Sequence, residues 1–184
     1  LLQTLGVPGT EAELGKPFNS PTWAVLGNHN DLYVSDGYGQ NYMHRFSQAG
    51  ELLTTWGGTG SEPGQFDIPH CVRVDRKDRV LVVDRSNSRV QIFDANGNFL
   101  SAWTHLTAAN DLFIDANDVV YLAEATKRIS IVDLAGNIIT QFGDAGHGPG
   151  QIVDAPHGIW IDSHGDVYVA EVGAKLALQK FARV

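Results

Sequence analysis

The chain has 184 residues, a net charge of −8 and 43% hydrophobic residues. This content suffices for a substantial buried core, and the acidic balance without a basic stripe argues against a nucleic-acid partner or an anionic membrane. No apolar run approaches the length of a membrane span, no signal-peptide pattern occurs in these residues, and the single cysteine, Cys71, excludes an internal disulfide. Cationic groups and metal ions are the partners that the charge favours.

One sequence pattern recurs four times. Its clearest copy has apolar runs at 68–75, 79–84, 89–94 and 98–103, each bounded by Asp, Asn or Gly. Such runs are typical of four β-strands joined by tight turns. A repeat of roughly 40 to 50 residues with four strands predicts the blades of a β-propeller. The sequence therefore predicts one all-β propeller domain over 1–184, with repeats at about 18–57, 66–103, 107–143 and 152–184.

Turn chemistry supports the repeats. The segments 94–98 and 133–137 read Asp-Ala-Asn-Gly-Asn and Asp-Leu-Ala-Gly-Asn, with the glycine that a tight hairpin needs. Glycine-rich stretches at 57–66 and 143–152 separate the repeats. No lysine or helix pattern follows them as a phosphate-binding loop requires, so we interpret them as linkers between blades.

The two ends of the chain complement each other in pattern. The fourth copy has three strand-like runs, whereas 1–6 reads Leu-Leu-Gln-Thr-Leu-Gly and matches the fourth strand of the other copies at 52–57 and 138–143. We therefore expect 1–6 to complete the last blade, which would close a four-bladed ring and remove exposed strand edges. The alternative is that the four blades are part of a six-bladed ring.

The first strand of each blade lines the central channel of a propeller. Alignment of the four first strands places one residue from each at an equivalent position; they are Thr22, His70, Asn110 and His157. Imidazole is a preferred ligand of zinc, so His70 and His157 are candidate metal ligands. The alternative is that both histidines are channel-lining hydrogen-bonding residues held by the prolines before them.

Several motifs resemble NHL repeats, and their order resembles the peptidyl-α-hydroxyglycine α-amidating lyases and their prokaryotic relatives. The resemblance covers essentially the whole chain. The matching segments are Ser20-Pro21-Thr22, Val34-Ser35-Asp36-Gly37-Tyr38, Trp56-Gly57, Pro63-Gly64-Gln65-Phe66, Pro69-His70, 83–91 and Pro156-His157-Gly158.

The resemblance implies a zinc-dependent carbon–nitrogen lyase that cleaves a peptidyl-α-hydroxyglycine to the peptide amide and glyoxylate, with a small peptide or other small molecule in the channel. His70 and His157 match two zinc ligands, Tyr38 matches the catalytic tyrosine and Arg85 matches an arginine beside it. Zinc would stabilise a developing alkoxide, Tyr38 would accept a proton, and Arg85 would bind a carboxylate or lower the pKa of the phenol. The alternatives are that Tyr38 is a half-exposed turn residue and that Arg85 pairs with Asp84 or Asp36.

The chain also departs from that family. Its third zinc histidine and second arginine precede the region that matches Leu1, and Gly158 stands where the family has a calcium-binding aspartate, so calcium is not expected there. His29, His44, His105, His147 and His164 lie off the equivalent position. Association of two chains is one way to supply further blades.

Two other functions remain open from the sequence. One is a non-catalytic NHL scaffold that binds a peptide or protein at a channel mouth. The other is a calcium-dependent lactonase of the propeller type, for which Asn110, Glu124 and Glu171 could provide oxygen ligands. Fold alone does not decide among these functions, because propellers support many.

Overall fold

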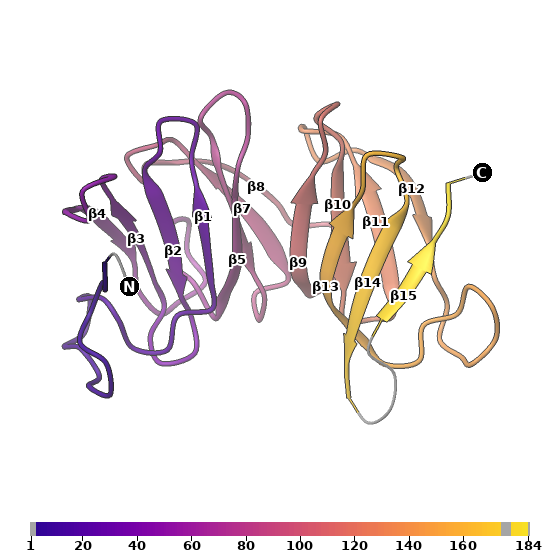
Figure 1. Ribbon diagram of the computed structural model, residues 1–184, viewed down its shortest axis with the longest axis horizontal. Helices are drawn as coiled ribbons and strands as arrows, with labels where there is room; N and C mark the ends of the chain where they lie inside the picture. Colours follow the sequence, from indigo (N-terminus) through magenta and orange to yellow (C-terminus); the bar gives the residue numbers. More distant parts are fainter. Residues whose placement is uncertain (1–2, 174–177, 184) are drawn as a thin grey trace. The chain divides into compact units, whose positions relative to one another are not determined.

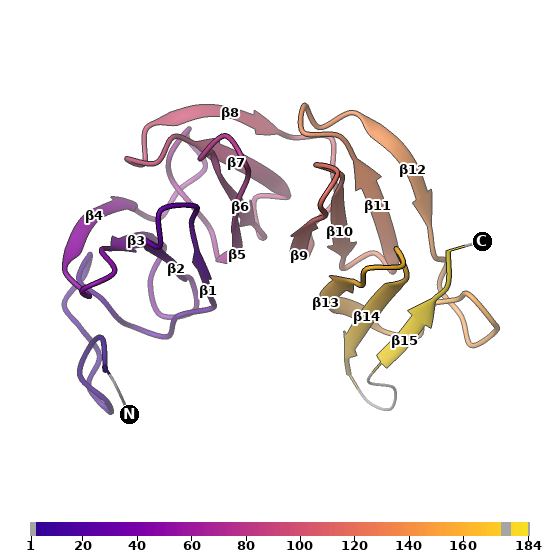
Figure 2. The same cartoon turned by 45° about the horizontal axis from the view of Figure 1, so that its top comes forward.

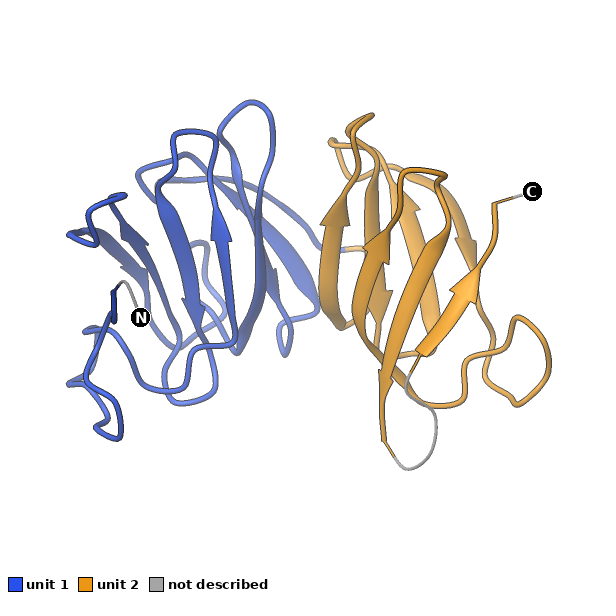
Figure 3. Cartoon of the chain, viewed as in Figure 1, with its two compact units in different colours: residues 1–104 blue, residues 105–184 orange. Residues whose placement is uncertain are grey.

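The computed structural model describes residues 3–173 and 178–183, and this part of the chain contains strands, turns and loops but no helix. It follows that none of the described residues forms a helix able to cross a membrane. The chain divides into two compact units, Leu1–Thr104 and His105–Val184, coloured blue and orange in Figure 3. The division falls between the second and third sequence repeats.

Unit 1 consists of two antiparallel sheets, each with four strands in chain order. These sheets are blades 1 and 2, and Figure 1 shows their strands side by side. Blade 1 contains β1 (Trp23–Leu26), β2 (Leu32–Asp36), β3 (Tyr42–Phe46) and β4 (Leu52–Gly57). Blade 2 contains β5 (Pro69–Val74), β6 (Val80–Asp84), β7 (Arg89–Phe93) and β8 (Phe99–Trp103).

Unit 2 contains blades 3 and 4, whose strand order is visible from a second direction in Figure 2. Blade 3 contains β9 (Ala109–Ile114), β10 (Val120–Glu124), β11 (Arg128–Val132) and β12 (Ile138–Phe142). Blade 4 contains β13 (Ala155–Ile161), β14 (Val167–Val172) and β15 (Leu178–Phe181) within the described residues. The predicted all-β arrangement of four propeller blades is confirmed.

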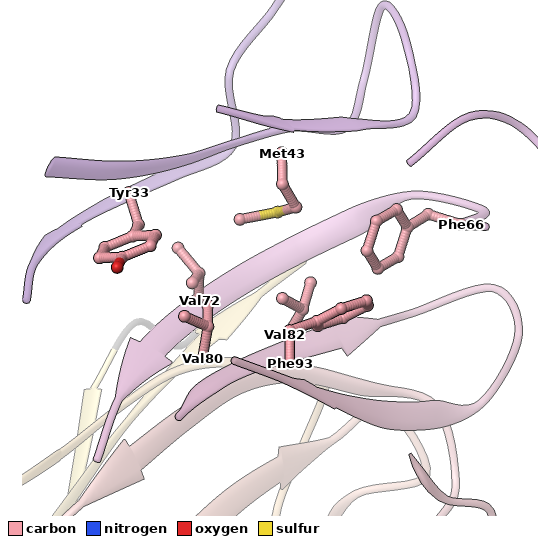
Figure 4. Packing of buried hydrophobic residues seen from close by; sticks show 7 residues of the cluster. All are labelled: Tyr33, Met43, Phe66, Val72, Val80, Val82 and Phe93. Atoms are coloured by element: carbon pink, nitrogen blue, oxygen red, sulfur yellow. The ribbon is translucent and has the colours of Figure 1, made fainter. Parts of the chain in front are cut away.

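The two blades of unit 1 share an apolar core. Tyr33 and Met43 of blade 1 pack with Val72, Val82 and other residues of blade 2, as Figure 4 shows. The second strand of blade 2 is the most enclosed, because every residue from Val80 to Asp84 is buried. Each buried Val or Met side chain stabilises the fold by roughly 1.5–3 kcal/mol. Apolar runs in the sequence thus become inner strands covered on both faces.

A β-bulge occurs at the same point of blades 2, 3 and 4. In blade 2 the register passes from the pair Pro69–Asp84 to the pair Cys71–Val83, so His70 is the additional residue. Blades 3 and 4 shift in the same way around Asn110 and His157. In blade 1 Thr22 directly precedes β1, and its N–H donates to the Ser35 carbonyl, opposite the first residue of that strand. Three of the four aligned positions are therefore bulges, which re-aim a side chain out of the regular ladder.

Residues 3–6 lie against blade 1 of their own unit and form no strand there. The Gln3 side chain donates to the Ala49 carbonyl at 2.8 Å, in the turn between β3 and β4. Residues 1 and 2 lie outside the described residues. The pairing of 1–6 with the last blade, and with it the closure of the ring, stays a prediction.

Candidate functional site

Two of the predicted site residues meet in unit 1. The Tyr38 hydroxyl oxygen lies 2.7 Å from Nε2 of His70, and the two rings are arranged edge to face with centroids 5.5 Å apart. The His70 side chain is buried, whereas Tyr38 is 56% exposed. A solvent-accessible phenol therefore contacts a buried imidazole that comes from the next blade.

Tyr38 reaches His70 because two glycines flank it in the loop between β2 and β3. A Cβ on Gly37 would lie far inside van der Waals contact with the Pro69 carbonyl, and a Cβ on Gly39 would overlap Asn19 in the same way. Glycine is the residue that permits such close approach of two backbones. We name residues 37–41 the Tyr38 loop; it is packed between the segments that lead into β1 and β5.

The segment before His70 is held from both sides. The N–H of Ile68 donates to Oδ1 of Asn41 in the Tyr38 loop at 2.8 Å, and the Ile68 carbonyl accepts from the N–H of Arg85 at 3.1 Å. Ile68 has a φ of 59°, which is rare for a β-branched residue and requires support from its surroundings. Its two hydrogen bonds provide that support directly before the Pro69-His70 pair.

Thr22 contributes to the same segment, although it carries no metal-binding group. Its hydroxyl donates to the Pro69 carbonyl at 2.7 Å, and the Ser35 hydroxyl lies 2.8 Å from the same oxygen of Thr22. A hydroxyl has one proton to donate, and the short distance to Pro69 identifies its acceptor. Thr22 therefore fixes the peptide that joins Pro69 to His70.

Arg85 follows β6, and its backbone is bonded to Ile68 as described above. Its guanidinium has no hydrogen-bond or ion-pair partner among the described residues. The alternative that Arg85 pairs with Asp84 is wrong, because Asp84 accepts from Nε of Arg89 at 2.7 Å. Nor does Asp36 pair with it: that carboxylate accepts hydrogen bonds from Asn19 and Gln40. Arg85 is thus available to bind an anionic group.

Every blade has a buried carboxylate at the end of its second strand. Asp84 is the clearest case, since it is fully buried and accepts the N–H of Asp67, which lies in the segment leading into β5, the first strand of the same blade. Burial raises the pKa of Asp84 above its ordinary value, while its hydrogen bonds and the Arg89 guanidinium oppose that shift. The equivalent residues are Asp36, Glu124 and Glu171. These carboxylates tie the segment before each first strand to its blade.

Glu124 and Glu171 are engaged within their own blades. Glu124 pairs with Arg128 at 2.6 Å and accepts from Thr107 and Ser130. Glu171 accepts from the N–H of Asp154 and from a glutamine side chain. Use of these oxygens for calcium, as a lactonase would need, requires those bonds to break.

Blade 1 departs from the pattern of its neighbours. Tyr42 occupies the position that holds Arg89 in blade 2, and the buried carboxylate is accompanied by His44 instead. Nε2 of His44 lies 3.6 Å from Oδ2 of Asp36, and both side chains are fully buried. Sequence reasoning missed this pair, because His44 was set aside for lying off the equivalent position. Asp36 directly precedes the Tyr38 loop.

In unit 2, His157 is partly buried at the bulge of blade 4. Nδ2 of Asn110 donates to the carbonyl of Pro156 at 2.7 Å. This bond repeats, with different residues, the contact between Thr22 and Pro69. Both prolines that precede the candidate histidines are therefore held by the equivalent position of the preceding blade.

The remaining histidines have local roles. His105 donates to the Gly136 carbonyl with Nε2 at 2.7 Å, and His29 lies 3.2 Å from Asp78 in an exposed turn. No group of three or more His, Cys, Asp or Glu side chains suited to a metal occurs in 3–173 and 178–183. The imidazole of His70 is a ligand type that zinc prefers, and binding of zinc through Nε2 would require the Tyr38 hydroxyl to move from its 2.7 Å contact with that atom.

A cavity lies elsewhere in the chain. It has a volume of about 620 Å³ in unit 2 and is lined mainly by side chains of blades 3 and 4, among them Tyr121, Phe142 and Phe181. None of the predicted site residues lines it. The candidate site is therefore the surface around Tyr38 and His70.

The fold is that of propeller blades, and comparison with known proteins finds an NHL repeat and similar proteins. The NHL repeat family model matches residues 66–93, which span blade 2 from its leading segment to the end of β7. The chain is 33% identical to NHL repeat-containing protein 3 of Homo sapiens over 98% of its own length and 55% of that protein.

The lyase kinship is also found. Peptidyl-alpha-hydroxyglycine alpha-amidating lyase 1 of Drosophila melanogaster is 30% identical, over 65% of this chain and 23% of that protein. A crystal structure of virginiamycin B lyase from Staphylococcus aureus has the same fold, with a TM-score of 0.68 and 13% identity, over 97% of this chain and 61% of that one. The chain thus spans about half the length of its human relative and about a quarter of the lyase.

Proposed function

We propose that this chain provides the Tyr38–His70 pair of a zinc-dependent carbon–nitrogen lyase, acting on a peptidyl-α-hydroxyglycine to give the peptide amide and glyoxylate. The observation that carries the proposal is the 2.7 Å approach of the Tyr38 hydroxyl to Nε2 of His70. Similarity to the Drosophila amidating lyase supports the same reaction. The peptide amide and glyoxylate would both form by cleavage of one substrate, without an added oxidant or reductant.

The proposed zinc ligands are the imidazoles of His70 and His157, with a third ligand from a further blade or a second copy of the chain. Catalytic zinc usually has three protein ligands and one open position. When bound, zinc would supply Lewis-acid stabilisation of negative charge on the substrate oxygen. Calcium is not part of the proposal.

The chain's own residues supply proton transfer and binding. Tyr38 would act as the base that takes the proton of the substrate hydroxyl while a carbon–oxygen double bond forms and the carbon–nitrogen bond breaks. The electron pair of the broken bond goes to the amide nitrogen, which takes up a proton. The free guanidinium of Arg85 would bind the substrate carboxylate by paired hydrogen bonds.

The test is glyoxylate release from an α-hydroxyglycine peptide by the protein with added zinc. We expect turnover, and we expect Tyr38→Phe to reduce it by roughly a hundredfold or more because the base is lost. Tyr42→Phe is the matched control, since the Tyr42 hydroxyl makes no hydrogen bond within the described residues. Equal turnover by the protein and its Tyr38→Phe variant would contradict the role of Tyr38.

A second candidate is a non-catalytic NHL scaffold that binds a peptide or protein. It is favoured by the match to NHL repeat-containing protein 3, which extends over 98% of this chain. Under this alternative, His70→Ala leaves peptide binding intact and no glyoxylate is released. Loss of both binding and turnover in that variant would favour the lyase.

A further inference from the structure

The two candidate histidines share a support that comes from the preceding blade. Thr22 donates to the Pro69 carbonyl, and Asn110 donates to the Pro156 carbonyl, each at 2.7 Å. Thr22 and Asn110 occupy the aligned position in blades 1 and 3 that the histidines occupy in blades 2 and 4, and in blades 2, 3 and 4 this position is a bulge. Within each unit, one repeat position thus presents first a hydrogen-bond donor and then a histidine.

The Pro69 carbonyl, which accepts the hydrogen bond from Thr22, belongs to the peptide that leads into His70. The peptide from Pro69 to His70 is planar, so the orientation of its carbonyl also sets the direction in which the His70 backbone begins. His70 is the additional residue of a bulge, so the register of the ladder is irregular at this point. Proline has no N–H to donate here. The bond from Thr22 therefore adds a constraint to the peptide that leads into the bulge.

A second tether from the same preceding blade accompanies each bond. Asn41 accepts the N–H of Ile68 at 2.8 Å in unit 1, and Nζ of Lys127 donates to the Val153 carbonyl at 2.7 Å in unit 2. Both tethers come from the residue directly before the third strand of the blade. The two tethers differ in direction and in the residue that they hold, but each fixes the segment that leads to its histidine.

We infer that Thr22 and Asn110 are positioning residues, which hold His70 and His157 in the orientation needed to bind a metal. This inference rests on the proposed function for the metal, but the orientation of the imidazoles is a property of the metal-free protein as well. Outer residues that orient a metal-binding histidine typically change metal affinity by 10- to 100-fold when they are replaced.

The experiment uses Thr22→Val, which keeps the side-chain shape and removes the donor, and Thr22→Ser, which restores it. The first readout is the imidazole NMR signals of His70 in the metal-free protein, and the second is zinc affinity measured by competition with a chelator. We expect Thr22→Val to shift the His70 signals and weaken zinc binding about tenfold, and Thr22→Ser to restore both. Thr55→Val is the matched control, because Thr55 lies 2.9 Å from Nδ1 of His44 and has no contact with the Pro69 segment.

Unchanged His70 signals in folded Thr22→Val would overturn the inference, whatever the zinc affinity. Absence of zinc binding by the unaltered protein would instead contradict the proposed function, and the metal-free signals would still decide the positioning role. If Thr22→Val fails to fold, Asn110→Asp provides the same test in unit 2 with the signals of His157. That variant keeps the shape of the side chain and removes the donor to Pro156.

Discussion

Tyr38 contacts His70 only because the residues on either side of it have no side chain. Gly37 faces the Pro69 carbonyl and Gly39 faces Asn19, and neither position has room for a Cβ. The motif Asp36-Gly37-Tyr38 therefore has a structural role, besides its resemblance to a family motif. It brings a loop of blade 1 against the segment that carries the histidine of blade 2.

Gly37→Ala should separate Tyr38 from His70. The new methyl group would meet backbone atoms that cannot rotate away, so we expect a loss of about 1–3 kcal/mol in unfolding free energy. Zinc affinity should fall as well, because the Pro69 segment must move. Denaturant unfolding and zinc competition measure the two effects.

Gly148→Ala provides the control for that substitution. A Cβ there would lie 3.0 Å from the end of the flexible Gln151 side chain, which can move aside. Zinc affinity should be unchanged in this control. If Gly37→Ala behaves like Gly148→Ala, the close approach does not determine the position of Tyr38.

At the scale of single residues, the sequence predicted positions better than contacts. His70, Asn110 and His157, which the repeat pattern aligned, are the additional residues of equivalent bulges in blades 2, 3 and 4. The bonds from Thr22 and Asn110 to proline carbonyls were not predicted. They depend on how neighbouring blades pack, and that is not encoded in any local pattern.

Among the elements, the second strand of each blade carries the polar anchor. In blade 2 the anchor is Asp84 with Arg89, whose guanidinium also donates to the carbonyls of Ser61 and Gln65 in the linker between blades. One arginine thus neutralises a buried carboxylate and fixes a loop. Pairing of Arg85 with Asp84 or Asp36 was an alternative left open by the sequence, but cross-strand pairing opposes Asp84 to Arg89.

Arg89→Met should destabilise the fold by about 3–5 kcal/mol at neutral pH, because it leaves Asp84 buried and unpaired. Without the guanidinium the pKa of Asp84 rises further above its ordinary value. A carboxyl whose pKa is raised by folding favours the folded state when protonated, so the deficit should shrink as the pH falls below that raised pKa. Denaturant unfolding at pH 7.5 and near pH 4.5 measures the difference.

Lys180→Met is the comparison for that experiment. Lys180 pairs with Asp166 at 2.7 Å, but its side chain is 49% exposed. Exposed pairs contribute about 0–1 kcal/mol, so its replacement should have a small effect. A deficit in Arg89→Met that does not change with pH would show that Asp84 is not its cause.

The turn after the third strand is also an element-scale feature that the sequence predicted correctly. Asp94 accepts the N–H groups of Asn96 and Asn98 and the side-chain amide of Asn98. These bonds, led by the one from the Asn98 side chain, hold the pKa of Asp94 below its ordinary value. The same bonds recur at Asp133 in blade 3.

Asp94→Asn should make the stability of the protein depend less on pH under acidic conditions. Because the pKa of Asp94 is lowered by folding, its contribution is present above the ordinary aspartate pKa near 4 and is lost as the pH falls through the lowered value. The variant should therefore lose less stability than the unaltered protein between pH 5 and pH 2.5. Thermal unfolding across this range is the measurement, and parallel curves would refute the assignment.

At the scale of the whole molecule, successive repeats alternate in the type of residue at the aligned position. Each unit contains a blade with a neutral donor at this position followed by a blade with Pro-His at the same position. The sequence predicted the four blades, because apolar runs, turns and linkers recur with them. The completion of the last blade by 1–6 could not be settled from pattern alone, since residues 3–6 also find partners in blade 1.

The central claim is that His70 and His157 are metal ligands. Its most direct test is the zinc content of purified, untagged protein after equilibration with zinc and removal of the excess, compared with His70→Ala and His157→Ala. We predict near-stoichiometric zinc in the unaltered protein and its loss in both variants. No retained zinc in the unaltered protein, or equal zinc in all three, would contradict the claim.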